Sequence, residues 1–118
     1  MDRSHQKGRE GERVAAKVLE EAGMQIIARN VLSSAGEVDL VALDGETIVF
    51  VEVKAWSTVG IEELRYAVAR KKQKRIIETA KHFLGSHQEY ADKSARFDVV
   101  FIGPGGVTHL ASAFMERL

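Results

Sequence analysis

Two apolar runs on either side of Asp44-Gly45 constrain the fold of this chain more than any other stretch. The runs cover residues 36–43 and 47–54, and both are rich in branched and apolar residues. An Asp-Gly pair between two such runs is the strongest short signal for a β-hairpin. Strands that are apolar on both faces are normally buried. The sequence therefore predicts a buried hairpin.

Three charged residues interrupt these strands: Asp39 in the first, and Glu52 and Lys54 in the second. An ionised side chain in a buried strand is costly unless it is paired or binds a metal. Glu52 and Lys54 are two residues apart and must share a face. If the loop is Asp44-Gly45, Asp39 lies opposite Phe50 and diagonal to Glu52 on that same face. A three-residue loop or a bulge would break this parity.

The composition is that of one soluble domain. The 118 residues are 45% hydrophobic and 29% charged, so we expect a single domain spanning residues 1–118. No apolar run suits a membrane span or a signal peptide, and we expect a cytoplasmic protein with no membrane partner. Cysteine is absent, which excludes disulfides and thiolate metal sites. Because the formal net charge is zero, binding to a polyanion needs local clustering of charge.

Helical spacing of apolar residues predicts a first helix over residues 9–22, after a polar segment, residues 1–8, that is expected to fray. Glu12 lies along the edge of the apolar stripe. The helix alone favours a solvated carboxylate there, and a position facing the sheet is the alternative.

A second helix is predicted over residues 62–84, and one of its faces is basic. Most charge runs are solvated helix surfaces. Five cations between residues 70 and 75, with no acid among them, shift the balance towards phosphate binding. The predicted nucleic-acid contacts are Arg70, Lys71, Lys72, Gln73 and Arg75.

The rest of the chain predicts three further strands and two short segments. Residues 25–32 form an edge strand, residues 96–102 a buried strand and residues 107–110 its short partner. Residues 86–95 form a polar linker with a turn of helix, and residues 113–118 a terminal helical turn. Asp98 is either a further acidic ligand or, as we favour, a structural residue paired with Arg96 or a backbone donor.

An Asp and a Glu that converge from adjacent strands supply hard oxygen ligands, which suit Mg²⁺ or Mn²⁺ rather than zinc. Such ions keep several waters and bind phosphate oxygens readily. A Lys two residues after the Glu can orient or deprotonate the attacking water, or neutralise charge in the transition state. The combination suits hydrolysis of a phosphodiester.

These residues resemble the PD-(D/E)xK nuclease motif. Asp39 is followed by Glu52-Val53-Lys54 and preceded by the helical Glu12, while Val38 stands where the motif's name has Pro. The ordered blocks along nearly the whole chain are similar to those of the YraN-like uncharacterised bacterial proteins. These blocks are Gly11-Glu12, Arg29-Asn30, Gly36-Glu37-Val38-Asp39, Phe50-Val51-Glu52-Val53-Lys54, Lys72-Gln73 and Arg96-Phe97-Asp98-Val99-Val100.

The resemblance implies an α/β restriction-endonuclease-like three-layer core, related to archaeal Holliday-junction resolvases. Its mixed central sheet is flanked by helices in the order α-β-β-β-α-β. By the same resemblance, Asp39 and Glu52 would bind Mg²⁺ or Mn²⁺ with the Val53 carbonyl, and Lys54 would act at the attacking water. Glu12 would hold a metal-bound water or a second ion.

The same resemblance implies that Lys72 or Gln73 approaches the scissile phosphate.

The leading hypothesis is a metal-dependent DNA endonuclease, with branched or damaged DNA as candidate substrate and a homodimer as candidate assembly. The alternative is a non-catalytic nucleic-acid-binding or adaptor module on a nuclease fold. A purely structural ion network ranks last, because a buried ionic cluster is a weak source of stability. The family carries no demonstrated substrate, so nuclease activity is a prediction from site chemistry and superfamily.

Overall fold

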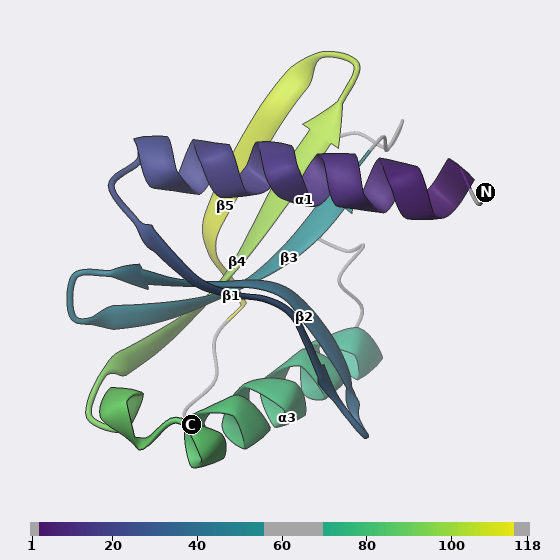
Figure 1. The fold of residues 1–118 in the computed structure, drawn as a ribbon. Coiled ribbons are helices and arrows are strands. Elements are labelled where there is room, and N and C mark those ends of the chain that lie inside the picture. Colours follow the sequence, from purple (N-terminus) through teal and green to yellow (C-terminus); the bar gives the residue numbers. More distant parts are fainter. Residues whose placement is uncertain (1–2, 56–69, 115–118) are drawn as a thin grey trace.

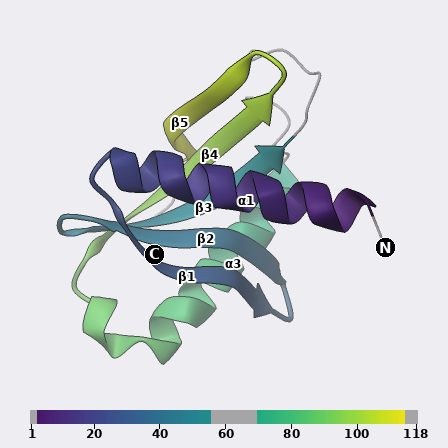
Figure 2. The same cartoon turned by 45° about the horizontal axis from the view of Figure 1, so that its top comes forward.

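A five-stranded mixed sheet carries the fold, with an α-helix on each of its faces (Figures 1 and 2). The structure, a computed structural model, describes residues 3–55 and 70–114. In space the strands follow the order β1-β2-β3-β4-β5, and only the β3–β4 pair is parallel. In chain order the elements are α1 (Arg3–Glu21), β1 (Gln25–Ser33), β2 (Gly36–Asp44), β3 (Thr47–Ala55), α3 (Arg70–Ser86), the 3₁₀ helix η1 (Gln88–Tyr90), β4 (Ser94–Gly103) and β5 (Gly106–Phe114).

The two helices explain why β2 and β3 are apolar on both faces. Along β3, Ile48 and Phe50 pack in the core under α3, while Val49 and Val51 pack in the core under α1. Parallel strands need a long crossover connection, and α3 lies in the crossover between β3 and β4. The predicted buried hairpin and the mixed sheet flanked by helices are therefore confirmed, with β5 longer than expected at the end.

The β2–β3 loop is Gly45-Glu46, so the predicted loop Asp44-Gly45 is wrong by one residue. Gly45 takes a φ of +60° at the first loop position, which a type II′ hairpin turn requires of its first central residue. The pairing consequently moves by two residues, and Val41 lies opposite Phe50. A shift of two preserves the parity of side chains, so this error leaves the predicted faces unchanged.

Both ends of the described chain differ from the prediction. α1 begins at Arg3, so the polar segment expected to fray is helical. Apolar periodicity cannot detect these first helical residues, because polar residues such as Arg, Gln and Lys favour helices without supplying an apolar stripe. β5 extends to Phe114, which replaces the predicted helical turn over residues 113 and 114. The predicted helical residues 62–69 lie outside the described residues. No described helix has the length and apolar composition needed to cross a membrane.

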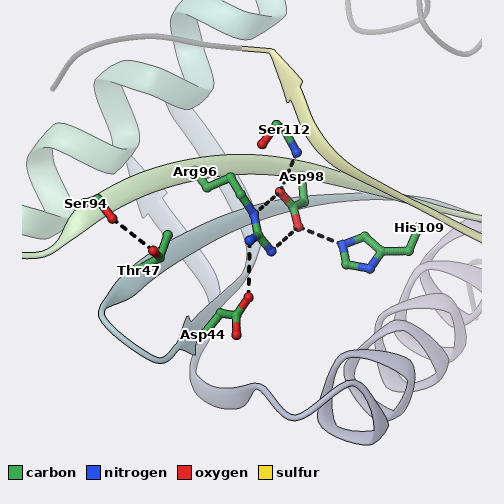
Figure 3. Close-up of polar contacts among 7 residues, drawn as sticks. All are labelled: Asp44, Thr47, Ser94, Arg96, Asp98, His109 and Ser112. Carbon is green, nitrogen blue, oxygen red and sulfur yellow. Dashed lines mark hydrogen bonds and ion pairs between the residues drawn. The ribbon is translucent and has the colours of Figure 1, made fainter.

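Asp98 is fully buried and is the centre of a polar network that fastens β5 to β4 (Figure 3). Its Oδ1 accepts hydrogen bonds from Arg96 Nε at 2.9 Å and the Ser112 backbone N–H at 3.0 Å. Its Oδ2 lies 3.0 Å from an Arg96 terminal nitrogen and 2.7 Å from His109 Nε2. Arg96 also reaches Asp44, at 3.2 Å. The structural role favoured for Asp98 is confirmed.

This network should make the fold acid-sensitive. Burial raises the pKa of Asp98, but hydrogen bonds from His109, Arg96 and Ser112 outweigh it and hold that pKa below its ordinary value. The ionised carboxylate therefore stabilises the fold above the unfolded-state pKa of about 3.9, and this stability is lost as pH falls through the lower folded-state pKa. Asp98→Asn should lower the urea midpoint strongly at pH 7, and its deficit relative to wild type should shrink towards pH 3.

The exposed Asp92 supplies the matched control, since Asp92→Asn should follow the wild-type profile at every pH. An Asp98→Asn deficit that is the same at pH 7 and pH 3 would contradict the account.

Candidate functional site

The site lies at a fork where β2 and β3 stop pairing. The ladder between them runs from Asp44 and Thr47 to Leu40 and Val51. Asp39 and Glu52 come next in the same register, and each is only 7% exposed. Asp39 therefore lies across from Glu52 rather than diagonal to it.

Asp39 and Glu52 influence each other electrostatically. Asp39 Oδ2 accepts a hydrogen bond of 2.7 Å from the backbone N–H of Val53, the residue after Glu52. Burial, followed by the charge of Glu52, raises the pKa of Asp39 to about 8, despite the opposing hydrogen bond from Val53. Two carboxyl groups placed so close together resist simultaneous ionisation. The expected convergence of the two strand carboxyls is thus present in the structure.

Two lysines converge on a single oxygen of Glu52. Lys72 Nζ, from α3, lies 2.8 Å from Glu52 Oε1, and Lys54 Nζ lies 3.6 Å from the same atom. Burial and the neighbouring Lys72 lower the pKa of Lys54. Burial opposes ionisation of Lys72 as well, but its hydrogen bond to Glu52 raises its pKa overall. Of the two, Lys54 is the lysine that gives up a proton more readily.

Glu12 faces the sheet, so the solvated position that the helix alone favoured is wrong. Burial raises the pKa of Glu12, and a hydrogen bond from Asn30 in β1 opposes that rise. The charge of Glu12 is in turn one of the causes that raise the pKa of Asp39. A Cβ added at Gly11 would overlap the Cβ of Ala55, so α1 lies directly against β3 beside Glu12. With α1 in this position, Glu12 is close enough to Asp39 for its charge to act on that carboxyl group.

The donor set suits a hard divalent ion that keeps much of its water. Among residues 3–55 and 70–114, no group of three or more His, Asp or Glu side chains is arranged to hold a metal ion. Glu12 is therefore not grouped with Asp39 and Glu52 as a third direct ligand. Mg²⁺ commonly binds through one or two carboxylates, with waters and phosphate oxygens completing its shell. A cation beside Asp39 and Glu52 would also relieve their mutual repulsion.

The predicted basic face of α3 meets the site at Lys72. Lys74 and Arg75 are exposed further along the helix, and Gln73 is partly buried. Arg70 and Lys71 begin the helix, and their side chains lie outside the described part of the chain. The direct ion pair between Lys72 and Glu52 was not predicted, because helical spacing does not reveal which cation meets which strand. Neither was the contact of Asn30 with Glu12.

Comparison with known proteins links the chain to one uncharacterised group. A family model described as "Uncharacterised protein family UPF0102" matches residues 11–102. A UPF0102 protein of Treponema pallidum (strain Nichols) is 47% identical over 113 residues, which cover 90% of each chain. Similar UPF0102 proteins occur in Pseudomonas fluorescens (strain Pf0-1), at 39% identity over 86% of this chain and 85% of the relative, and in Persephonella marina, at 36% identity over 92% of each.

The close contact at Gly11 predicts that even one methyl group will be destabilising. Gly11→Ala should reduce the free energy of unfolding by about 1–3 kcal/mol, the usual cost of overpacking, because the helix must move off Ala55. Gly85 in α3 is the control, since a Cβ there meets nothing within 4 Å. Gly85→Ala should be neutral or stabilising by up to about 1 kcal/mol in the same urea titration. Equal stability of the two variants would contradict the packing.

The raised pKa of Asp39 predicts an opposite pH effect to that of Asp98. The folded protein holds the Asp39 proton up to a pH of about 8, whereas the unfolded chain releases it near its ordinary pKa. Stability of the metal-free protein should therefore fall as pH rises between these two values. Asp39→Asn should flatten that decline in urea midpoints measured with EDTA, and Glu21→Gln, at an exposed carboxylate at the end of α1, should leave it in place. An unchanged slope in Asp39→Asn would contradict the burial of an ionisable pair.

Proposed function

We propose that this chain, which belongs to the uncharacterised protein family UPF0102, is an endonuclease that hydrolyses DNA phosphodiester bonds with Mg²⁺ or Mn²⁺. The observation that carries the proposal is the buried Asp39–Glu52 pair at the fork of β2 and β3, with two lysines on Glu52. The element order, which begins α-β-β-β-α-β, supports a PD-(D/E)xK, restriction-endonuclease-like core.

Asp39 and Glu52, with the Val53 carbonyl, are the proposed metal ligands. When bound, the ion would polarise a phosphate oxygen and acidify the attacking water. Lys54 has the lowered pKa that suits a proton acceptor, so it is the proposed general base at that water. Lys72 keeps its proton, so its ammonium would stabilise charge that develops on the phosphate. Glu12 would orient a water at the edge of the site.

The proposed DNA contacts lie along the beginning of α3. Arg70, Lys71, Lys72, Gln73 and Arg75 would meet the phosphate backbone, whose contacts position DNA without reading its sequence. The resemblance to junction resolvases supports branched or damaged DNA as substrate and a homodimer as the acting assembly. Such a substrate also supports a cytoplasmic location.

A second function is favoured by one specific observation. Glu52 has two ammonium partners, Lys72 at 2.8 Å and Lys54 at 3.6 Å. A carboxylate satisfied in this way suits a non-catalytic nucleic-acid-binding or adaptor module that retains the nuclease fold. The endonuclease proposal ranks first, because lysine pairing alone does not account for the burial of Asp39 beside Glu52.

Cleavage of a substrate panel tests the proposal. The purified protein should nick linear, nicked, flapped or four-way DNA with Mg²⁺ or Mn²⁺. Glu52→Ala and Lys54→Ala should each lower the rate by about 100-fold or more, because they remove a metal ligand and the proton acceptor. Glu78→Ala, at an exposed acid elsewhere on α3, should cleave at the wild-type rate.

The pattern of loss separates the two candidate functions. Cleavage that survives both site substitutions would contradict the assignment of the site. Salt-dependent DNA binding without cleavage of any substrate, under either metal, would favour the binding module. Melting temperatures of all variants show whether a loss of activity reflects unfolding.

A further inference from the structure

Asn30, in the middle of β1, has a φ of +51°. Among the described residues, only Asn30 and Ser112 are non-glycine residues with positive φ. This left-handed conformation is unfavourable for most residues and is best tolerated by Gly, Asn and Asp. At Ser112 the conformation lies in the irregular stretch opposite Asp98, where the Ser112 N–H donates to that buried carboxylate. The positive φ at Ser112 thus allows a hydrogen bond to a buried acid, and the positive φ at Asn30 calls for a similar explanation.

The strand register places Asn30 next to the candidate site. β1 pairs with β2 through Arg29–Leu40 on one side and Val31–Val38 on the other, which leaves Asn30 across from Asp39. The side chain of Asn30 makes a hydrogen bond to Glu12, which comes from α1. Asn30 thus lies across from Asp39 in the sheet and interacts with Glu12 of α1.

The chemistry of the pair explains why an asparagine occupies this position. An ionised carboxylate can only accept hydrogen bonds, so the Asn30 amide N–H donates to Glu12. Glycine would tolerate the same backbone conformation but has no donor. Alanine has no donor and is also strained at positive φ. Asn30 therefore combines the backbone conformation with a hydrogen-bond donor to Glu12.

We propose that Asn30 is a positioning residue, which directs the Glu12 carboxylate towards the fork so that Glu12 can hold a metal-bound water beside Asp39. This inference rests on the proposed endonuclease function and adds to it a residue outside the Asp39, Glu52 and Lys54 set. Asn30 itself touches no reacting atom. It acts through Glu12, and its loss should matter only while Glu12 is present.

Glycine and alanine variants separate the side chain from the backbone. Asn30→Gly should keep the wild-type melting temperature, because glycine accepts a φ of +51°, whereas Asn30→Ala should melt lower. Asn30→Gly should nevertheless lower kcat by about 10–100-fold with little change in KM, as expected for loss of a residue that orients a site group. Calorimetry with Mg²⁺ alone should show weaker binding in the same variant, independently of turnover.

A double-mutant cycle with Glu12 decides the assignment. If Asn30 acts through Glu12, then Glu12→Gln combined with Asn30→Gly should be no worse than Glu12→Gln alone. Additive losses, or an Asn30→Gly protein with wild-type kcat and Mg²⁺ affinity, would overturn the role of Asn30 while leaving the endonuclease intact. A wild-type protein that neither cleaves DNA nor binds Mg²⁺ would overturn both. Leu32→Ala, at a 69% exposed position in the same strand, should behave as wild type.

Discussion

The burial of two adjacent carboxyl groups is the constraint on which the arrangement of this protein depends. Asp39 and Glu52 meet where β2 and β3 separate, and each is nearly excluded from water. Burial and mutual repulsion would both act against this pairing unless cations were supplied. Lys54 supplies one from the same strand, and Lys72 supplies another from α3. The position of α3 therefore determines whether the charges at the fork are balanced, because Lys72 comes from that helix.

The surrounding fold places these groups through backbone features rather than through the charges themselves. The parallel crossover from β3 to β4 puts α3 over one face, so that Lys72 meets the end of β3. On the other face, Gly11 lets α1 lie against Ala55, and Glu12 is then close enough to Asp39 for its charge to act there. Positive φ angles occur beside two buried acids, at Asn30 across from Asp39 and at Ser112 beside Asp98. Departures from regular strand geometry thus coincide with the carboxylates.

The predictions from sequence were correct for features that depend on residues close together along the chain. Alternation along a strand sufficed to put Glu52 and Lys54 on one face. Asp39 kept its predicted face despite the misplaced loop, because the pairing between the strands shifted by two residues, an even number. Asp98 was correctly paired with Arg96, two residues away on the same strand. The loop position itself was missed, because Asp-Gly suits a turn with both residues in the loop, whereas Gly45 occupies the first loop position.

The chain by itself determined the buried hairpin, the shared face of its charges and the family resemblance, since each follows from residue type and spacing along the backbone. Only the tertiary structure decided that Glu12 is partly buried against the sheet, that Lys72 rather than another cation of α3 pairs with Glu52, and that Asn30 reaches Glu12. Those contacts join residues far apart in the chain. Whether a residue on the surface of a helix becomes buried depends on how closely that helix approaches the sheet. The spacing of apolar residues within one helix carries no information about that distance.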